Sequence, residues 1–357
     1  MISPEIPQRP LLAGLEPRHF AHPLDVSARR RMDRLIAGKP RMGKLFASLE
    51  RSLEDEEYLK NLADNTRLNE SQAPSLYRLV EEVAADARMP TPRVFLDTQA
   101  EVNAWALGQN RPMITLTSAL VDQFSEAEVR AVVAHELGHI KCQHTFYRLV
   151  SQGFDPVAAA ASALPGGSLV ALALRWHLMD WFRKSELSSD RFSLLVTGDL
   201  QAVQSVILRL AGGASSLHTE LSNDEFRQQA KEFRQTVEAR KRGTIRNRIE
   251  FYTSSLMLQD AMNTHPWPAI RFVEIEDWAK SRQYRLIAEG NLDEAERHPH
   301  QYLPETVADD GVDDPDAVEA PDEPEPILRQ AKTELAGLWK KRLSKAPTNP
   351  DAGSAED

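Results

Sequence analysis

The sequence has little cysteine, no excess of positive charge and no visible pattern of a signal segment. Its single cysteine, Cys142, excludes an internal disulfide framework and fits a reducing compartment. The net charge of −10 argues against a nucleic-acid partner. The first 20 residues show no basic segment followed by an apolar one, so we expect no secretory signal and a cytoplasmic protein.

One uncharged stretch, 157–174, bears on the membrane question. Its 18 residues reach the lower limit for a membrane-spanning helix. Pro165, Gly166 and Gly167 interrupt it, and each half is too short to cross ~30 Å of hydrocarbon. We therefore favour a buried helical hairpin, and keep membrane contact through this stretch as the alternative.

Four segments differ in composition and predict the domain organisation. Residues 1–74 form an extended and then helical N-terminal region, and residues 75–290 form the candidate catalytic domain. Residues 291–326 are rich in acidic residues and proline, which predicts a disordered linker. Residues 327–357 contain an amphipathic helix that either packs back onto the domain or docks a partner.

The expected elements give an α+β fold, mainly helical with a small β-sheet. Residues 1–24 carry five prolines and predict an extended lead-in. Ser125 and Glu128 form a capping box that starts a helix with apolar residues at helical spacing. Further helices are expected near 75–88, 169–196, 200–211, 222–240, 245–262 and 269–281, and strands at 94–96 and 113–117.

The helix after the capping box carries a metal-binding pattern, His135-Glu136-Leu137-Gly138-His139. Four residues correspond to about 40° of helical rotation, so both imidazoles leave one face. Two imidazoles at this spacing can bind one Zn²⁺ ion, with Glu136 as general base for its water. Gly138 costs roughly 1 kcal/mol of helix propensity, which an ordinary packing helix has little reason to carry.

A catalytic zinc ion needs a third protein ligand and an open fourth position. His144 lies nine residues after His135, about 180° around a continuing helix, and is therefore expected to be exposed and to face away. Glu186 is the better candidate. Asp190 follows one helical turn later, the arrangement expected when a second carboxylate orients a metal-bound imidazole. Alone, such a carboxylate pair is usually a solvated helix face.

The chain resembles the HtpX-like and CaaX prenyl protease family of zinc metallopeptidases over roughly residues 75–285. The resemblance is carried by Asn103-Ala104 before the 113–117 strand, by the HELGH sequence at 135–139, by Glu186 with Asp190, and by His265-Pro266 followed by Arg271. Typical membrane members have long spanning helices that this chain lacks, so it is similar to a soluble branch. Their membrane substrates therefore do not carry over.

The resemblance implies a gluzincin-type domain with an active-site helix and an edge strand that binds substrate. It implies one Zn²⁺ per chain on His135, His139 and Glu186, with Glu136 as base and Asp190 behind the ligands. It implies that His265 stabilises the oxyanion. The substrate-binding residues it implies are Asn103, Ala104, Ile114, Thr115 and Arg271, with the 113–117 strand pairing to the substrate backbone.

These features predict a zinc-dependent metalloendopeptidase, with a polypeptide substrate and a role in protein quality control. Two alternatives remain. One is zinc-dependent hydrolysis of a small amide, which has no support in the sequence. The other is a non-proteolytic zinc-bearing scaffold that recruits partners through its acidic tail. Glu136 speaks against the scaffold, because a structural metal site does not require a general base.

Overall fold

The structure, a computed structural model, describes residues 12–37, 40–145, 167–212, 215–217, 220–241 and 267–300. The chain divides into two compact units, one of residues 1–150 and 177–310 and one of residues 151–176 and 311–357. All elements described below belong to the first unit, except the initial residues of α9.

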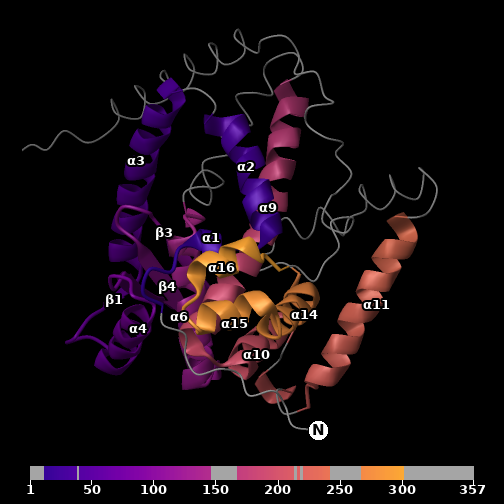
Figure 1. Cartoon of the computed structure of the whole chain (residues 1–357). Coiled ribbons are helices and arrows are strands. Elements are labelled where there is room, and N and C mark those ends of the chain that lie inside the picture. Colours follow the sequence, from indigo (N-terminus) through magenta and orange to yellow (C-terminus); the bar gives the residue numbers. More distant parts are fainter. Residues whose placement is uncertain are drawn as a thin grey trace, which may run out of the picture. The chain divides into compact units, whose positions relative to one another are not determined.

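The helices begin and end close to where the sequence predicts them (Figure 1). The helices that the sequence predicts include α4, α6, α9, α10, α11 and α14. Four short helices, α1, α5, α15 and α16, were not predicted. Their bounds are α1 Pro17–Phe20, α2 Pro23–Ala37, α3 Pro40–Asp64, α4 Pro74–Asp86, α5 Ser118–Gln123, α6 Glu126–Lys141, α9 Gly167–Thr197, α10 Leu200–Leu210, α11 Asn223–Lys241, α14 Pro268–Ala279, α15 Arg282–Ala288 and α16 Leu292–Arg297, with a short 3₁₀ turn at Ser215–Leu217.

A four-stranded mixed sheet has the order β1-β2-β4-β3, with β1 Thr66–Leu68, β2 Arg93–Asp97, β3 Ala104–Leu107 and β4 Met113–Thr117. The small sheet beside many helices confirms the α+β prediction. Strand β4 is an interior strand, parallel to β2 and antiparallel to β3. The expectation that the 113–117 strand is a free edge is therefore wrong. Among the described residues, the edge next to α6 is β3.

Helix α6 is buried because it lies between β3, α4, α9 and α10. Ser125 and Glu128 form the predicted capping box, and the carboxylate of Glu128 also pairs with Ser205 and Arg209 of α10. Gly138 marks a close approach to α9. A Cβ atom there would lie 3.0 Å from the Cα atom of Ser189. The glycine therefore has a packing reason, which offsets its cost in helix propensity.

The described N-terminal residues from Leu12 onward are folded against the rest of the first unit rather than extended. Leu12, Leu15 and Phe20 are buried in the main hydrophobic core, and α1 packs against α15 and α16. Pro17 and Pro23 stand at the first positions of α1 and α2, where the missing N–H of proline costs nothing. The expectation of an extended lead-in is wrong for this part of 1–24, because prolines there start helices.

Helix α16 lies within the range where the sequence predicts the acidic linker. Ala295 is fully buried, and the folded part reaches at least to residue 300, where His300 contacts Asp277. The remaining linker and the C-terminal helix at 327–357 lie outside the described residues, as do the expected helix at 245–262 and residues 157–166.

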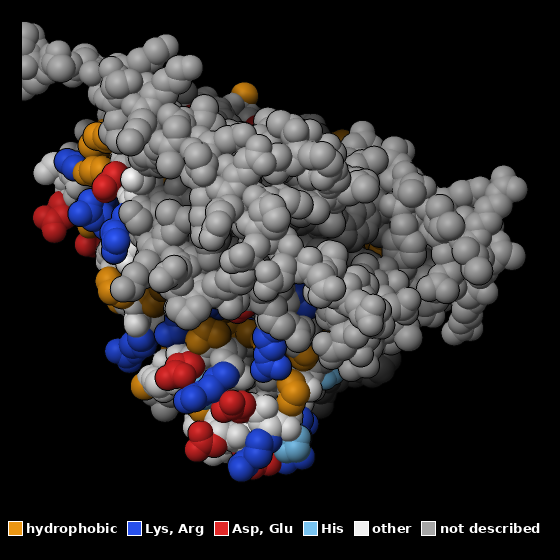
Figure 2. Space-filling view, turned by 90° about the horizontal axis from the view of Figure 1, so that it is seen from above, with side chains coloured by type: hydrophobic (Ala, Val, Ile, Leu, Met, Phe, Trp, Pro, Cys, Tyr) orange, Lys and Arg blue, Asp and Glu red, His pale blue; other side chains and the backbone are white. Residues whose placement is uncertain are grey.

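Within the described part of the chain, none of the helices is both long and apolar enough to span a membrane. The face drawn in Figure 2 shows described Lys and Arg side chains interspersed with Asp and Glu.

Candidate metal centre

Two imidazoles of α6 point at each other from adjacent turns. The Nε2 atoms of His135 and His139 are 3.1 Å apart, and both side chains are buried. Their i, i+4 spacing on a regular helix places them on one face, as the sequence predicts. The two nitrogen atoms therefore define one side of a small polar site inside the protein.

Glu186 of α9 supplies a carboxylate that faces both imidazoles. Its Oε1 atom lies 3.2 Å from Nε2 of His139, and its Oε2 atom lies 3.4 Å from Nε2 of His135. Gly138 permits this contact, because α9 approaches the α6 backbone at Ser189, between Glu186 and Asp190. The structure thus brings the three predicted ligand side chains together.

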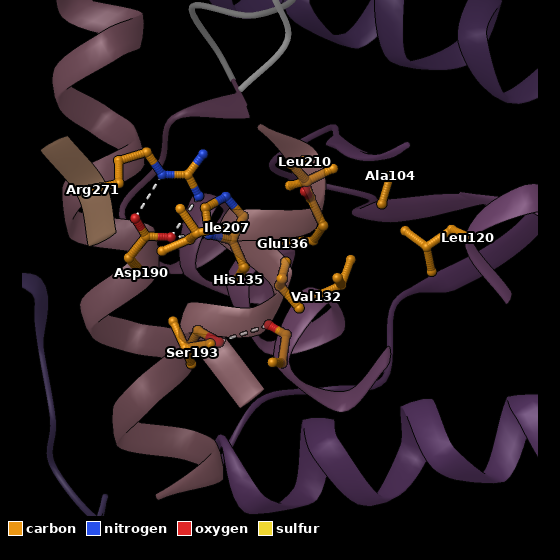
Figure 3. A pocket seen from close by; sticks show the side chains of 13 residues that line it. Ala104, Leu120, Val132, His135, Glu136, Asp190, Ser193, Ile207, Leu210 and Arg271 are labelled. Carbon is orange, nitrogen blue, oxygen red and sulfur yellow. Dashed lines mark hydrogen bonds and ion pairs between the residues drawn. The ribbon is translucent and has the colours of Figure 1, made fainter. Parts of the chain in front are cut away.

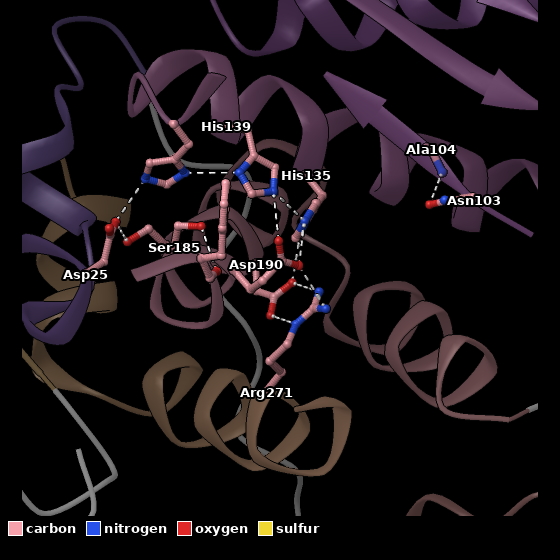
Figure 4. A network of polar contacts seen from close by, with 12 residues as sticks. Asp25, Asn103, Ala104, His135, His139, Ser185, Asp190 and Arg271 are labelled. Carbon is pink, nitrogen blue, oxygen red and sulfur yellow. Dashed lines mark hydrogen bonds and ion pairs between the residues drawn. The ribbon is translucent and has the colours of Figure 1, made fainter. Parts of the chain in front are cut away.

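Asp190 and Arg271 lie behind the ligands (Figure 4). Asp190 Oδ1 is 3.0 Å from Nδ1 of His135, and Arg271 donates to both oxygens of Asp190 at 2.7 and 2.6 Å. Arg271 also pairs with Glu186 at 3.0 Å. Since Asp190 is an acceptor, His135 donates from Nδ1, which leaves Nε2 as the atom that faces Glu186 and His139 and that is free to bind a metal ion once it is deprotonated.

His139 has a corresponding partner that the sequence did not predict. Nδ1 of His144 lies 3.0 Å from Nδ1 of His139, and Nε2 of His144 lies 3.0 Å from Oδ2 of Asp25. His144 is buried, so the expectation of an exposed residue is wrong. Helix α6 ends at Lys141, and the chain reverses at Gln143, whose φ is 60°.

Burial and the neighbouring carboxylates together shift the pKa values of His135 and His139 in opposite directions. Burial lowers the pKa of His135, but hydrogen bonds to Asp190 and Glu186 outweigh it and raise the pKa to about 9. Burial lowers the pKa of His139 to about 4, although Glu186 opposes this shift. Burial raises the pKa of Asp190, but Arg271 and His135 bring it below its usual value. Without a metal ion, His135 therefore carries the proton of the pair.

Glu136 is buried next to His135 and borders a small cavity (Figure 3). The cavity has a volume of about 20 Å³. Most of its wall is apolar and comes from β3, α5, α6 and α10. The polar lining residues are His135, Glu136, Asp190, Ser193 and Arg271. His135, Glu136 and His139 form a group that could hold a metal ion, with ligand atoms within 4.8 Å of one another.

The residues predicted to bind substrate are not all near this cavity. Asn103 and Ala104 precede and begin β3, and the side chain of Asn103 accepts a hydrogen bond from the Ala104 N–H at 2.9 Å. Ile114 and Thr115 are buried in the interior strand β4, and Thr115 donates to Asn61. They are not at the edge where a substrate strand could pair.

Arg271 is bound to two site carboxylates rather than directed toward solvent, since its side chain is only 2% exposed. Its contacts are those of a residue that holds Glu186 and Asp190 in place. His265, the proposed oxyanion donor, lies outside the described residues.

Comparison with known proteins agrees with this arrangement. A family model described as Peptidase family M48 matches residues 70–279. The chain is 31% identical over 283 residues to Plastoglobule-localized metallopeptidase 48, chloroplastic, of Arabidopsis thaliana, covering 78% of this chain and 77% of that protein. It is 31% identical to a Protease HtpX homolog of Ralstonia pickettii, covering 39% and 57%, and 28% identical to one of Burkholderia mallei, covering 61% and 78%. No solved structure matches.

The fold, the buried metal-binding group and these matches together define a metallopeptidase. More particularly, the chain belongs to peptidase family M48.

Proposed function

We propose that this protein is a zinc-dependent endopeptidase that binds one Zn²⁺ per chain through His135, His139 and Glu186. The spacing of the three ligand groups carries the proposal. The two Nε2 atoms lie 3.1 Å apart, and each faces its own oxygen of Glu186, His139 at 3.2 Å from Oε1 and His135 at 3.4 Å from Oε2. Ligand atoms arranged tetrahedrally at about 2.0–2.1 Å from zinc are about 3.3–3.4 Å from one another. Two imidazoles, a carboxylate and this spacing fit a catalytic zinc site.

Two glutamates compete for the role of third ligand. Glu136 belongs to the group whose atoms lie within 4.8 Å of one another. Glu186 reaches both Nε2 atoms at 3.2 and 3.4 Å, a closer match to a tetrahedron. We assign Glu186 as the ligand for this reason. Glu136 follows His135 on the adjoining stripe of α6 and borders the cavity, which suits a residue that contacts water and substrate.

The proposed mechanism uses Glu136 as a proton carrier. Zinc, when bound, supplies Lewis-acid activation of water and of the scissile carbonyl. Glu136 takes a proton from the attacking water and delivers it to the leaving amine, so no acyl-enzyme is needed. Asp190 holds His135 in the tautomer that exposes Nε2, and Arg271 holds Asp190 and Glu186. By the resemblance, His265 stabilises the oxyanion.

We place the substrate backbone along β3. Asn103 accepts the N–H of Thr117 with its carbonyl, so its main chain faces β4. Main-chain groups alternate in direction along a strand, and those of Ala104 and Ala106 therefore face the outer edge, where the Ala104 N–H already donates to the side chain of Asn103. A substrate added there would pair through its main chain, which tolerates many sequences. Asn103 and Ala104 keep their proposed role, whereas Ile114, Thr115 and Arg271 lose theirs.

The cavity beside Glu136 suits one substrate side chain. Its walls include Ala104 of β3, Val132 of α6 and Leu210 of α10. A volume of about 20 Å³ is close to the space of one water molecule. We propose that it receives a small apolar side chain adjacent to the scissile bond. A role in protein quality control and a cytoplasmic location remain predictions from the sequence.

Casein cleavage by the full-length protein tests the proposal. Wild type is expected to cleave casein, to lose activity with a zinc chelator and to regain it with added Zn²⁺. Glu136→Gln should retain zinc and lose at least about 100-fold in kcat, since general-base catalysis contributes about 10²–10⁴-fold. Equal cleavage by Glu136→Gln and wild type would refute the assigned base, and the scaffold alternative requires that neither protein cleaves.

A further inference from the structure

Each imidazole of the α6 pair has its own chain of buried supports. Asp190 contacts His135, whereas His139 contacts His144, which in turn contacts Asp25. Figure 4 shows Asp190 and Asp25 at the two ends of this network. We infer that Asp25 and His144 form a positioning relay for His139, so that a residue of the N-terminal helix α2 tunes metal binding. The inference rests on the proposed zinc site. Asp25 lies outside the segment 70–279 that matches the family model.

The proton positions of the relay follow from its acceptor end. Ionised Asp25 can only accept, so His144 donates from Nε2 across the 3.0 Å contact. With its proton on Nε2, the ring of His144 accepts at Nδ1, and His139 donates from its own Nδ1 across 3.0 Å. This leaves the lone pair of His139 Nε2 directed at His135 and Glu186. The opposite order would place a proton on Nε2, where a metal ligand needs a lone pair.

The relay is held rigidly at its carboxylate. Asp25 accepts hydrogen bonds from the indole N–H of Trp181 at 3.1 Å and from the hydroxyl of Ser188, both on α9. Its side chain is only 4% exposed, and that of His144 only 3%. Buried hydrogen bonds to a charged acceptor are strong and fix geometry, so the carboxylate can orient His144.

The turn that carries His144 is held by α2 as well. The N–H of His144 donates to the carbonyl of His139 at 2.8 Å, and that of Gln143 donates to Ile140 at 3.1 Å, which is a Schellman motif. Arg29, one turn after Asp25, donates to the carbonyl of Cys142 at 2.6 Å and to the side chain of Gln143 at 2.7 Å. Helix α2 therefore fixes both the backbone and the ring of His144.

Two substitutions interrupt the relay at different links. Asp25→Asn keeps the shape of the carboxylate but removes its charge and one acceptor. His144→Gln places an amide where it can still donate to Asp25, but removes the Nδ1 acceptor of His139. Either change should weaken zinc binding about tenfold or more, since partners of metal-bound histidines are worth about 10–100-fold in affinity. Because Asp25 acts through His144, it should matter little once His144 is changed.

The experiment measures zinc affinity of full-length proteins by competition with a chromophoric chelator. Four proteins form a double-mutant cycle: wild type, Asp25→Asn, His144→Gln and the double variant, each checked metal-free by circular dichroism. Asp64→Asn is the matched control, the same change at an exposed position at the end of α3. We expect Asp25→Asn to cost about tenfold in wild type, about twofold or less with His144→Gln, and nothing at Asp64.

Two results would overturn the relay: an unchanged affinity in Asp25→Asn, or an equal loss with and without His144, which indicates a general effect on folding. Glu186→Gln separates this from failure of the proposed function. If wild type binds no zinc, or Glu186→Gln binds as tightly as wild type, the proposed zinc site itself is wrong.

Discussion

Replacing Gly138 with alanine tests whether the close approach of α6 and α9 is what sets the metal site. A Cβ atom at this position would lie 3.0 Å from Ser189 Cα, 3.1 Å from Phe192 Cβ and 3.2 Å from Ser189 O. Ordinary contacts begin at 3.4 Å. Two of the three neighbours are backbone atoms of α9 and cannot rotate away, so the helices must separate by roughly 0.4 Å.

Two energies oppose each other in this variant. Alanine in place of glycine gains about 1 kcal/mol of helix propensity. Overpacking a tight interface costs about 1–3 kcal/mol. The metal-free variant should therefore be less stable than wild type by about 0–2 kcal/mol. Separation also moves Glu186 from the imidazoles, at present 3.2 and 3.4 Å away, so zinc affinity should fall by about tenfold, or ~1.4 kcal/mol.

Denaturant unfolding of the metal-free protein and chelator competition measure the two effects. Ala127→Gly, an exposed change at the start of the same helix, calibrates the propensity term alone and should leave zinc affinity unchanged. If Gly138→Ala raises stability by the full ~1 kcal/mol and binds zinc as wild type does, the close approach does not constrain the site and the reasoning is refuted.

Four further predictions concern the same site. Asp190→Asn should weaken zinc binding by about 10–100-fold in chelator competition, with an unaltered affinity contradicting its role behind His135. Zinc must displace the proton from His135, whose pKa is about 9, so affinity measured from pH 6 to 10 should rise up to about tenfold per unit and level off above 9. The folding stability of the metal-free protein should depend on pH in the opposite direction. The stabilisation that comes from the raised pKa of His135 is complete below about pH 6.5 and is lost as the pH rises through 9. A zinc affinity or a metal-free stability that does not change with pH would contradict the assignment of the proton to His135. Leu210→Ala should enlarge the cavity and admit larger apolar residues beside the scissile bond in a peptide library, and an unchanged preference would exclude the cavity as a substrate pocket.

The sequence predicts the ligand helices because local rules determine them. The capping box fixes the start of α6, and helical spacing alone places His135 and His139 on one face and Glu186 and Asp190 on another. These relations hold within a single helix and need no tertiary information. The contact between the ligand faces of α6 and α9 is a tertiary interaction. In the sequence, only Gly138 indicated that another element comes close to α6.

The errors arise where the chain leaves regular structure. The angle that excluded His144 assumed that α6 continues, but the helix ends in a Schellman turn with Gln143 in the left-handed region usually occupied by glycine. The resemblance alone made the 113–117 strand the edge. The sequence offered no correction, because β3 reads Ala-Trp-Ala-Leu and has no β-branched residue, so it was not recognised as a strand.

The N-terminal region shows why supports are harder to predict than ligands. A metal ligand must match the chemistry and spacing of its neighbours, and both can be read along one helix. A residue that orients a metal-bound histidine needs only to place one hydrogen-bond acceptor near the free ring nitrogen. Any helix, strand or loop of the fold can carry such a residue. Asp25 lies 119 residues before His144, on a helix whose sequence is otherwise charged and unremarkable in pattern. Its role follows only from burial and from its contacts with His144, Trp181 and Ser188, so variants of α2 should affect the metal site although the helix carries no ligand.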